Sequence, residues 1–199
     1  MNIKEAKKII VSLSKPEKMP GYAYGIPAAE CKTGKKLRLI PNTVCYGCYA
    51  MKGNYTRYPA IKAAQYRRLD AIKNPLWVEA MAAVIKRQKW FRWHDAGDLQ
   101  SVDHMNKIIE VCKLTPDTQH WLPTQERQYL PKPEDVPANL IIRLSAAKVD
   151  GTAGNAWTHS STVVTDGAPS CRAPDQGGKC LDCRACWDKD VKNVSYGKH

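Results

Sequence analysis

The sequence predicts an α/β protein built on a parallel β-sheet that is either open or partly closed as a barrel. Three observations predict this class. Strand-like and helix-like segments alternate in the second half of the chain, and the connections between them are short. Residues 139–145 (NLIIRLS) are nearly continuously apolar, as expected of a strand that is buried on both faces. The length of 199 residues, 43% of them hydrophobic, suits one domain with a normal core.

The first half of the chain alternates less regularly. A short basic helix begins near Lys4 and is stopped by Pro16 and Pro20, and two longer helices precede residue 90. Pro75 stands at an acceptable first-turn position of the second of these. The predicted helices cover residues 4–13, 58–73 and 75–88, and the predicted extended segments cover 21–29 and 35–40.

The second half alternates plainly. Ser101 can cap a helix whose apolar stripe ends at Cys112, and Arg143 interrupts an apolar strand, so its side chain must face a cavity, an acidic partner or solvent. The predicted strands are 90–93, 118–123, 139–145 and 160–165. Because parallel strands end at a common edge, the polar residues that follow them are expected to face one mouth.

Three such polar residues follow the first of these strands: His94, Asp95 and Asp98. They are predicted to bind a ligand or to act in acid–base catalysis, since they end a strand and precede a helix N-terminus. The alternative is a polar loop whose aspartate caps the next helix. Gln125 occupies the equivalent position one strand later.

The charge is distributed very unevenly. The net charge is +12, and residues 1–92 hold 19 basic and 5 acidic residues, whereas residues 93–199 hold 12 basic and 14 acidic residues. The basic N-terminal half predicts a nucleic acid or another anionic substrate as partner, with a solubility surface as the alternative. No segment has the length and apolar character of a membrane helix or a signal peptide, so we expect a cytoplasmic protein without membrane contact.

Seven of the eight cysteines form two groups. The first group is Cys31, Cys45 and Cys48, and the second is Cys171, Cys180, Cys183 and Cys186. In a reducing compartment, CxxC spacing favours metal or redox chemistry over disulfides. Three thiolates can hold a [4Fe-4S] cubane with one iron left open, whereas zinc would need a fourth ligand such as His94, His120 or a cysteine of the second group.

The second group is a complete set of four ligands. It suits closed structural zinc or an auxiliary iron–sulfur cluster, and one of its members is the other candidate for completing the first site. Residues 169–199 are therefore predicted to be a cysteine-rich metal-binding tail, packed on a single α/β domain of residues 1–168. Cys112, on its apolar helical stripe, is expected in the core.

Four segments together resemble the bacteriophage gene product 88 family. They are 45–55 (CYGCYAMKGNY), 92–99 (RWHDAGDL), 121–126 (WLPTQE) and 180–187 (CLDCRACW). More distantly, the CxxCYA loop and the strand ending in Gly-Asp resemble radical S-adenosylmethionine proteins. That resemblance implies a partial (β/α) barrel and a [4Fe-4S] cluster on Cys31, Cys45 and Cys48. It also implies that Gly97 and Asp98 lie near bound S-adenosylmethionine, and Tyr49 and Gln125 are predicted as further cofactor contacts.

These observations predict an iron–sulfur protein of a phage, located in the host cytoplasm, with one or two [4Fe-4S] clusters and His94, Asp95 and Asp98 as catalytic residues. Its substrate would be a nucleic acid or another anion. Two alternatives stay open: a zinc-stabilised nucleic-acid-binding protein without catalytic activity, and a cluster-based redox protein without radical chemistry.

Overall fold

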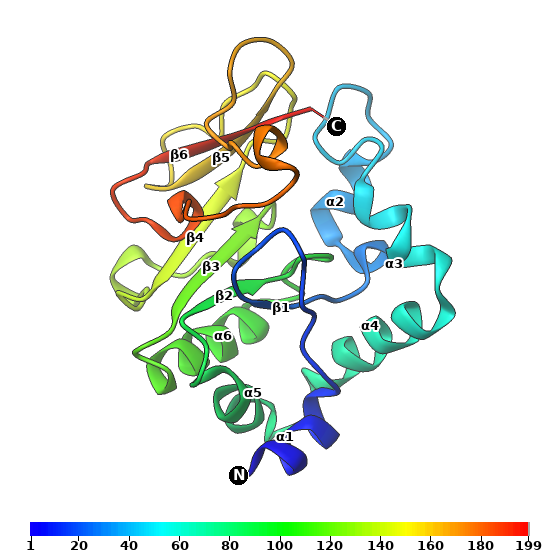
Figure 1. Ribbon diagram of the computed structural model, residues 1–199, viewed down its shortest axis with the longest axis vertical. Coiled ribbons are helices and arrows are strands. Elements are labelled where there is room, and N and C mark those ends of the chain that lie inside the picture. Colours follow the sequence, from blue (N-terminus) through cyan, green and yellow to red (C-terminus); the bar gives the residue numbers. More distant parts are fainter. Residues whose placement is uncertain (199) are drawn as a thin grey trace.

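A computed structural model describes residues 1–198 and contains one six-stranded sheet in the order β1-β2-β3-β4-β5-β6, with every strand parallel to its neighbours (Figure 1). The strands are β1 (Tyr22–Tyr24), β2 (Trp90–Trp93), β3 (Gln119–Thr124), β4 (Leu140–Ser145), β5 (Ser160–Val164) and β6 (Asn193–Gly197). The predicted α/β class and parallel sheet are confirmed. The sheet is open, since among residues 1–198 strands β1 and β6 each pair with one neighbour only.

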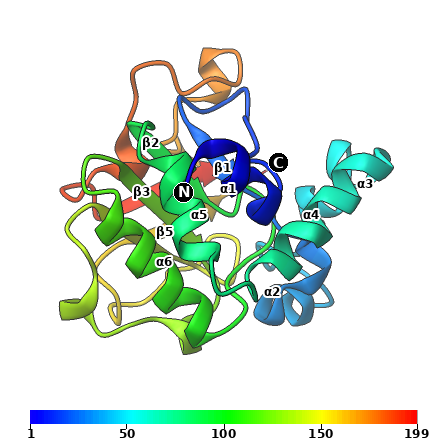
Figure 2. The same ribbon diagram turned by 90° about the horizontal axis from the view of Figure 1, so that it is seen from below.

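Six α-helices precede or connect the first three strands. They are α1 (Ile3–Ile10), α2 (Lys32–Leu37), α3 (Asn54–Arg57), α4 (Pro59–Ala71), α5 (Trp77–Ile85) and α6 (Val102–Leu114). Seen from below, α1, α5 and α6 lie together against the sheet (Figure 2). No helix within residues 1–198 is long and apolar enough to cross a membrane. The strand predicted over 35–40 is wrong, because lysine and leucine favour the helix α2 that forms there.

The two faces of the sheet carry different side chains. Phe91 and Trp93 of β2 are fully buried in the core shared with α1, α5 and α6, together with Leu122 of β3. Trp121 points to the other face, where it packs with Ala23 of β1. This alternation follows from the two-residue period of a strand. The face away from the helices is therefore available for a site.

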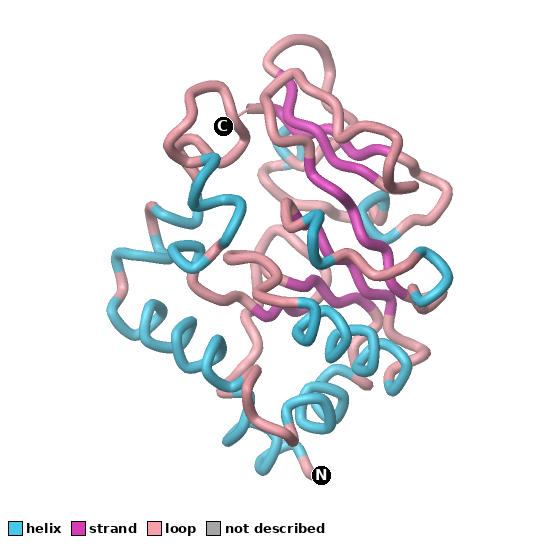
Figure 3. Tube along the Cα trace, turned by 180° about the vertical axis from the view of Figure 1, so that it is seen from behind, coloured by secondary structure: helices cyan, strands magenta, loops and turns pink. Residues whose placement is uncertain are grey.

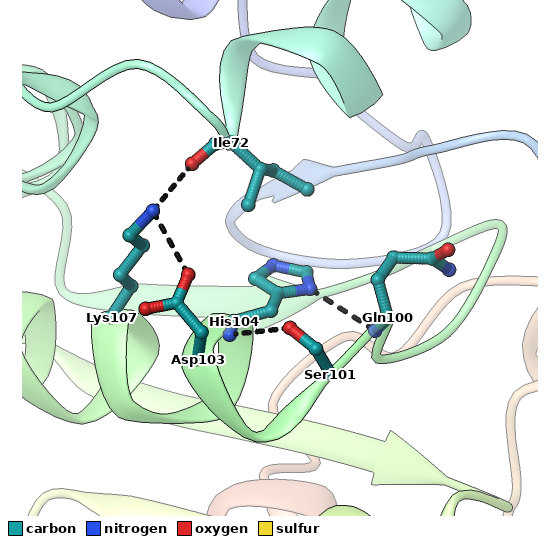
Figure 4. Close-up of polar contacts among 6 residues, drawn as sticks. All are labelled: Ile72, Gln100, Ser101, Asp103, His104 and Lys107. Atoms are coloured by element: carbon teal, nitrogen blue, oxygen red, sulfur yellow. Dashed lines mark hydrogen bonds and ion pairs between the residues drawn. The ribbon is translucent and has the colours of Figure 1, made fainter.

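The N-terminus of α6 shows why this helix begins at Val102 (Figure 4). The Ser101 side chain accepts a hydrogen bond of 3.1 Å from the backbone N–H of His104. One turn later, Lys107 Nζ donates to the carbonyl oxygen of Ile72 (2.8 Å), which lies at the end of α4, and pairs with Asp103 (3.1 Å). This contact fixes α6 against the C-terminal end of α4.

The connection between β5 and β6 crosses the face opposite the α-helices. This segment, orange to red in Figure 1, passes over β3 and β4 through the 3₁₀ turn η6 (Ala185–Trp187). Trp187 packs on Trp121, and its Nε1 donates to the carbonyl oxygen of Phe91 at 2.9 Å. Figure 3 shows the strands from the opposite side as one twisted sheet. Strand β6, which has no strong sequence signal, completes that sheet.

Arg143 holds this crossing segment in place. Its side chain is fully buried on β4, and its guanidinium donates to backbone carbonyl oxygens of Ala185 (2.7 Å), Cys186 (3.0 Å) and Asp188 (2.9 Å). Arg143 was expected to face a cavity, an acidic partner or solvent. Its guanidinium instead donates to the backbone carbonyl groups in and directly after η6. It thereby positions the last cysteine of the second group.

Three histidines are buried in a neutral form, which predicts acid sensitivity. Burial lowers the pKa of His94 to about 4 and that of His120 to about 3, and it lowers the pKa of His104 well below its ordinary value. Between about pH 6.5, the ordinary histidine value, and the lowered values, the unfolded chain binds protons that the folded chain does not. Stability is therefore fully present above that range and is lost as the pH falls through it.

We expect His120→Gln, which cannot titrate, to lose less unfolding free energy than the parent between pH 6.5 and pH 4. The difference in slope should approach about 1.4 kcal/mol per pH unit. Urea denaturation at several pH values measures it. Parallel pH profiles for parent and variant would contradict the assignment of acid sensitivity to His120.

Candidate functional site

All of the first cysteine group and three members of the second line one cavity of about 600 Å³. One wall contains the first group, from the loops between β1 and α3, and another contains Cys171, Cys180 and Cys186 from the β5–β6 connection. Arg92 of β2 and Trp121 of β3 also line the cavity. The cavity therefore lies on the face of the sheet opposite α1, α5 and α6. A volume of this size is typical of small-molecule sites.

Helix α2 brings Cys31 and Cys45 together across the segment that separates them. Cys31 immediately precedes this helix, and Gly34 lies in its first turn. A Cβ atom at Gly34 would stand 3.1 Å from Cys31 Cβ, 3.7 Å from Cys31 Sγ and 3.5 Å from Cys45 Sγ. The absence of a side chain at Gly34 therefore leaves room for the thiols of Cys31 and Cys45 on the same side of this residue.

The loop that contains Cys45 and Cys48 is tied to the carboxyl end of β4. Thr43 forms an antiparallel bridge with Lys148, and the backbone N–H of Val44 donates to Ala147 at 3.0 Å. A second bond of 3.0 Å runs from the N–H of Val149 to Asn42. The residues after β4 therefore hold these cysteines near the carboxyl ends of the strands, where the polar residues of the site were predicted to meet.

Burial and nearby acidic groups oppose the ionisation of the Cys31 and Cys45 thiols. Burial raises the pKa of Cys31 far above its ordinary value, and Asp98, Cys45, Cys48 and Glu126 raise it further. Burial likewise raises the pKa of Cys45 to about 12, with Cys48 and Asp98 adding to the shift. Without a cation beside them these thiols stay protonated, so a bound metal would be needed to hold them as thiolates.

Glu126 fixes the start of α2 and hence Cys31. It is fully buried, and its Oε1 accepts from the backbone N–H groups of Lys32 (3.0 Å) and Thr33 (2.7 Å). Its Oε2 accepts from Thr33 Oγ1 and Gln128 Nε2, both at 2.7 Å. A carboxylate from the end of β3 thus satisfies the free N–H groups of a helix more than ninety residues earlier.

Residues after β2 place a carboxyl group beside the cavity. His94 has a left-handed backbone (φ 60°), and its Nδ1 lies 3.0 Å from the carbonyl oxygen of Tyr24. Asp95 Oδ2 accepts from Tyr55 at 3.3 Å, whereas Asp95 Oδ1 is buried without a hydrogen-bond partner among residues 1–198. A Cβ atom at Gly25 would overlap this Oδ1, so any larger residue there would displace the Asp95 carboxyl group. Asp95 is thus a cavity-lining carboxyl group with one oxygen that has no partner among residues 1–198.

Asp98 joins two strand ends. Its Oδ1 accepts from Thr124 Oγ1 (2.6 Å) and the N–H of Leu99 (2.8 Å), and its Oδ2 accepts from the N–H of Gln125 (2.8 Å). Burial raises its pKa to about 7. The Gln125 amide in turn donates to Ala146 at 2.9 Å. Both side chains hold the cavity wall together.

All six residues predicted at the catalytic and cofactor sites line the cavity: His94, Asp95, Gly97, Asp98, Tyr49 and Gln125. The Tyr49 hydroxyl donates to the carbonyl oxygen of Asp95 at 2.7 Å, which connects the cysteine loop to the loop after β2. Gly97 has φ 83° and lies directly against Ile26. The structure brings the predicted residues together, and their roles remain predictions.

The second cysteine group surrounds a smaller cavity lined by all four of its members. The backbone N–H of Cys171 donates to Ser195 of β6 at 2.9 Å, and that of Cys180 donates to Lys18 at 2.8 Å. Cys186 Sγ lies 3.2 Å from the hydroxyl of Tyr196. No disulfide forms within residues 1–198, and no three histidine, cysteine or acidic side chains there are spaced for a single metal ion.

A family model described as gene product 88 matches residues 1–189. The chain belongs to the gene product 88 family. This match includes both cysteine groups and strands β1 to β5. A comparison with curated proteins found no match. A comparison with solved structures found none either.

Two residues of this gene product 88 family member have positions that the sequence did not suggest. His120, a candidate fourth zinc ligand, lies on the helix side of the sheet, where it stacks on Trp93 and its Nε2 lies 2.9 Å from Thr115 Oγ1. Arg92 lines the cavity instead. The signal for Arg92 was the strand period, which places it on the face opposite Phe91 and Trp93.

Proposed function

We propose that this member of the gene product 88 family is an iron–sulfur enzyme in which Cys31, Cys45 and Cys48 hold a [4Fe-4S] cluster. The observation that carries this proposal is that three thiols, and no more from their own loops, line a cavity large enough for a substrate. Three protein ligands leave one iron of a cubane without a protein ligand.

Such a cluster supplies one-electron transfer and a site for substrate or S-adenosylmethionine at the open iron. The protein's own groups would orient that ligand. Asp95, whose Oδ2 accepts from Tyr55, would accept from an amino or hydroxyl group of that ligand. His94, with its lowered pKa, stays neutral near pH 7 and would accept rather than donate a charge-assisted bond. Asp98 and Gln125 would keep the two strand ends in register.

The strand order supports a more specific architecture for this function. Sequence neighbours are sheet neighbours from β1 to β6, without the reversal that defines doubly wound sheets. This is the order of a (β/α) barrel that has been opened between its first and last strands. We therefore propose that the sheet is a partial barrel whose concave face contains the cavity.

A second candidate function rests on Cys171, Cys180, Cys183 and Cys186, which line one small cavity as a complete set of four thiols. Such a set suits closed structural zinc as well as an auxiliary cluster. With zinc alone, the basic first half would make the protein a nucleic-acid-binding protein without catalytic activity. That protein would be colourless, and its affinity for nucleic acid would fall steeply with salt.

Anaerobic purification followed by iron, sulfide and zinc analysis tests the proposal. We expect a brown protein with about four or eight irons per chain, and loss of about four of them in Cys45→Ser and Cys48→Ser. Cys112→Ala is the matched control, because this thiol is buried in the core on the helix side and does not line the cavity. Unchanged iron in both serine variants would refute the ligand assignment.

The same preparation separates the catalytic function from simple redox function. Reduction in the presence of S-adenosylmethionine, followed by chromatography, would detect cleavage of this compound. Reversible optical changes without cleavage would favour a redox protein. A colourless protein with zinc only would favour the nucleic-acid-binding alternative.

A further inference from the structure

Arg92 is a cation at the cavity, and Asp95 is its charged neighbour there. Arg92 lies on β2, on the wall that also includes Trp121. None of the ion pairs formed within residues 1–198 includes Arg92. Its Nε is buried and has no hydrogen-bond partner in that part of the chain. A buried donor that is left unused is unfavourable unless a ligand satisfies it.

The two terminal nitrogens of Arg92 have only weak partners. Nη1 lies 3.7 Å from Met19 Sδ, and Nη2 lies 3.5 Å from the Tyr49 hydroxyl oxygen. Both distances exceed those of strong charge-assisted hydrogen bonds. By contrast, the guanidinium of Arg143 makes short bonds to three carbonyl groups. Of these two arginines, Arg92 is the one that still has donors available for an anionic ligand.

The protein holds the guanidinium in one place. Arg92 Cζ lies 4.6 Å from the centre of the Trp121 ring, a distance typical of cation–π stacking. Tyr49, directly after Cys48, approaches it from one cysteine group. Cys186 and Tyr196, from the β5–β6 connection and β6, line the same cavity. Arg92 therefore lies between the two cysteine groups, on a fixed aromatic support.

We propose that Arg92 binds the carboxylate or phosphate group of a small-molecule substrate in this cavity. A guanidinium offers a planar pair of donors that matches either anion. Asp95 lines the same cavity, and its carboxyl group would accept from a hydroxyl or amino group of the same molecule. The inference deepens the proposed function, since the anion would be part of the substrate of that site.

Calorimetric titration with sodium acetate and with inorganic phosphate, at constant ionic strength, tests the site on the protein as purified. We expect binding of at least one probe and a loss of at least about tenfold in affinity for Arg92→Met. Arg92→Lys should retain part of the affinity, since it keeps the charge but loses the paired donors. The preferred probe distinguishes a carboxylate from a phosphate source.

Arg87→Met is the matched control, because this arginine is exposed beyond the end of α5 and does not line the cavity. It should bind both probes as the parent does. Equal affinities in parent and Arg92→Met would overturn the inference, as would the absence of binding of either probe to the parent. If Arg92→Met does not fold, Arg92→Lys and Arg92→Gln supply the same comparison.

Iron and sulfide analysis of the same samples separates the two proposals. A parent protein without iron that binds the anion through Arg92 would contradict the proposed cluster and support this site. An iron-containing protein that binds neither probe would do the reverse. Loss of metal in Arg92→Met, with no anion bound by the parent, would identify Arg92 as a counter-ion for the metal-bound thiolates and overturn the inference.

Discussion

Replacing Glu126 by alanine is expected to destabilise the protein by about 3 kcal/mol or more. The variant leaves four donors without an acceptor: the N–H groups of Lys32 and Thr33, the Thr33 hydroxyl and the Gln128 amide. Each buried donor that loses its partner costs about 1–3 kcal/mol, less where water replaces it. Urea denaturation monitored by circular dichroism measures the change.

The same substitution should also reduce metal binding, because Glu126 orders the turn that follows Cys31. We expect iron at the first cysteine group to fall in parallel with stability. Glu134→Ala is the control, since Glu134 is an exposed carboxylate of the turn η4 (Pro133–Asp135) and should change stability by less than about 0.5 kcal/mol. Equal unfolding free energies for the two variants would show that Glu126 is not needed to start α2.

Replacing Gly97 by alanine is expected to have a comparable effect for a different reason. Gly97 has a left-handed backbone (φ 83°), and a Cβ there would overlap Ile26 Cγ1 and lie 2.7 Å from the Ile26 carbonyl oxygen. Backbone strain costs about 1 kcal/mol, and the overlap adds about 1–3 kcal/mol. Since Asp95 and Asp98 flank this residue, the cavity should lose ligand affinity together with stability.

Gly167→Ala separates these two contributions. Gly167 has nearly the same backbone angle (φ 84°), but nothing lies within 4 Å of a Cβ placed there. We expect only the backbone cost, about 1 kcal/mol, in thermal and urea unfolding of this variant. A Gly97→Ala variant no less stable than Gly167→Ala would mean that Ile26 moves aside without cost.

Local signals explain the parts of the fold that the sequence predicts. Residues 90–93 are mostly aromatic and form β2 over those positions. Ser101 caps α6 as expected, and the apolar stripe that ends at Cys112 is buried. These elements are fixed by residues within a few positions of each other. A single sequence contains that information.

The remaining elements depend on contacts between distant residues. Helix α2 begins where Glu126 accepts its N–H groups, and nothing near residue 32 indicates that acceptor. Strand β6 contains polar and small residues and exists because β5 offers it an unpaired edge. For the same reason, the sequence left open whether a cysteine of the second group belongs to the first site, whereas the structure places Cys171, Cys180 and Cys186 in the cavity that the first group lines.

Residues of the candidate site were predictable to different degrees. His94, Asp95 and Asp98 followed from their place after a buried strand, and all three line the cavity. The sequence does not indicate that Asp98 has protein donors on both oxygens while Asp95 keeps a free one, because tertiary hydrogen bonds decide this. The strand period places Arg92 on the cavity face, but only the structure shows that its Nε has no hydrogen-bond partner within residues 1–198.

The crossing of the β5–β6 connection over the sheet implies an order of assembly during synthesis. Residues 165–197 leave the ribosome after the first five strands, so those strands can pair while the face of the sheet opposite α1, α5 and α6 is still uncovered. The first cysteine group is then open to solvent on that side. Once Trp187 packs on Trp121 and β6 pairs with β5, access from that side narrows. For the proposed cluster, we therefore expect insertion to be most efficient before the chain is finished.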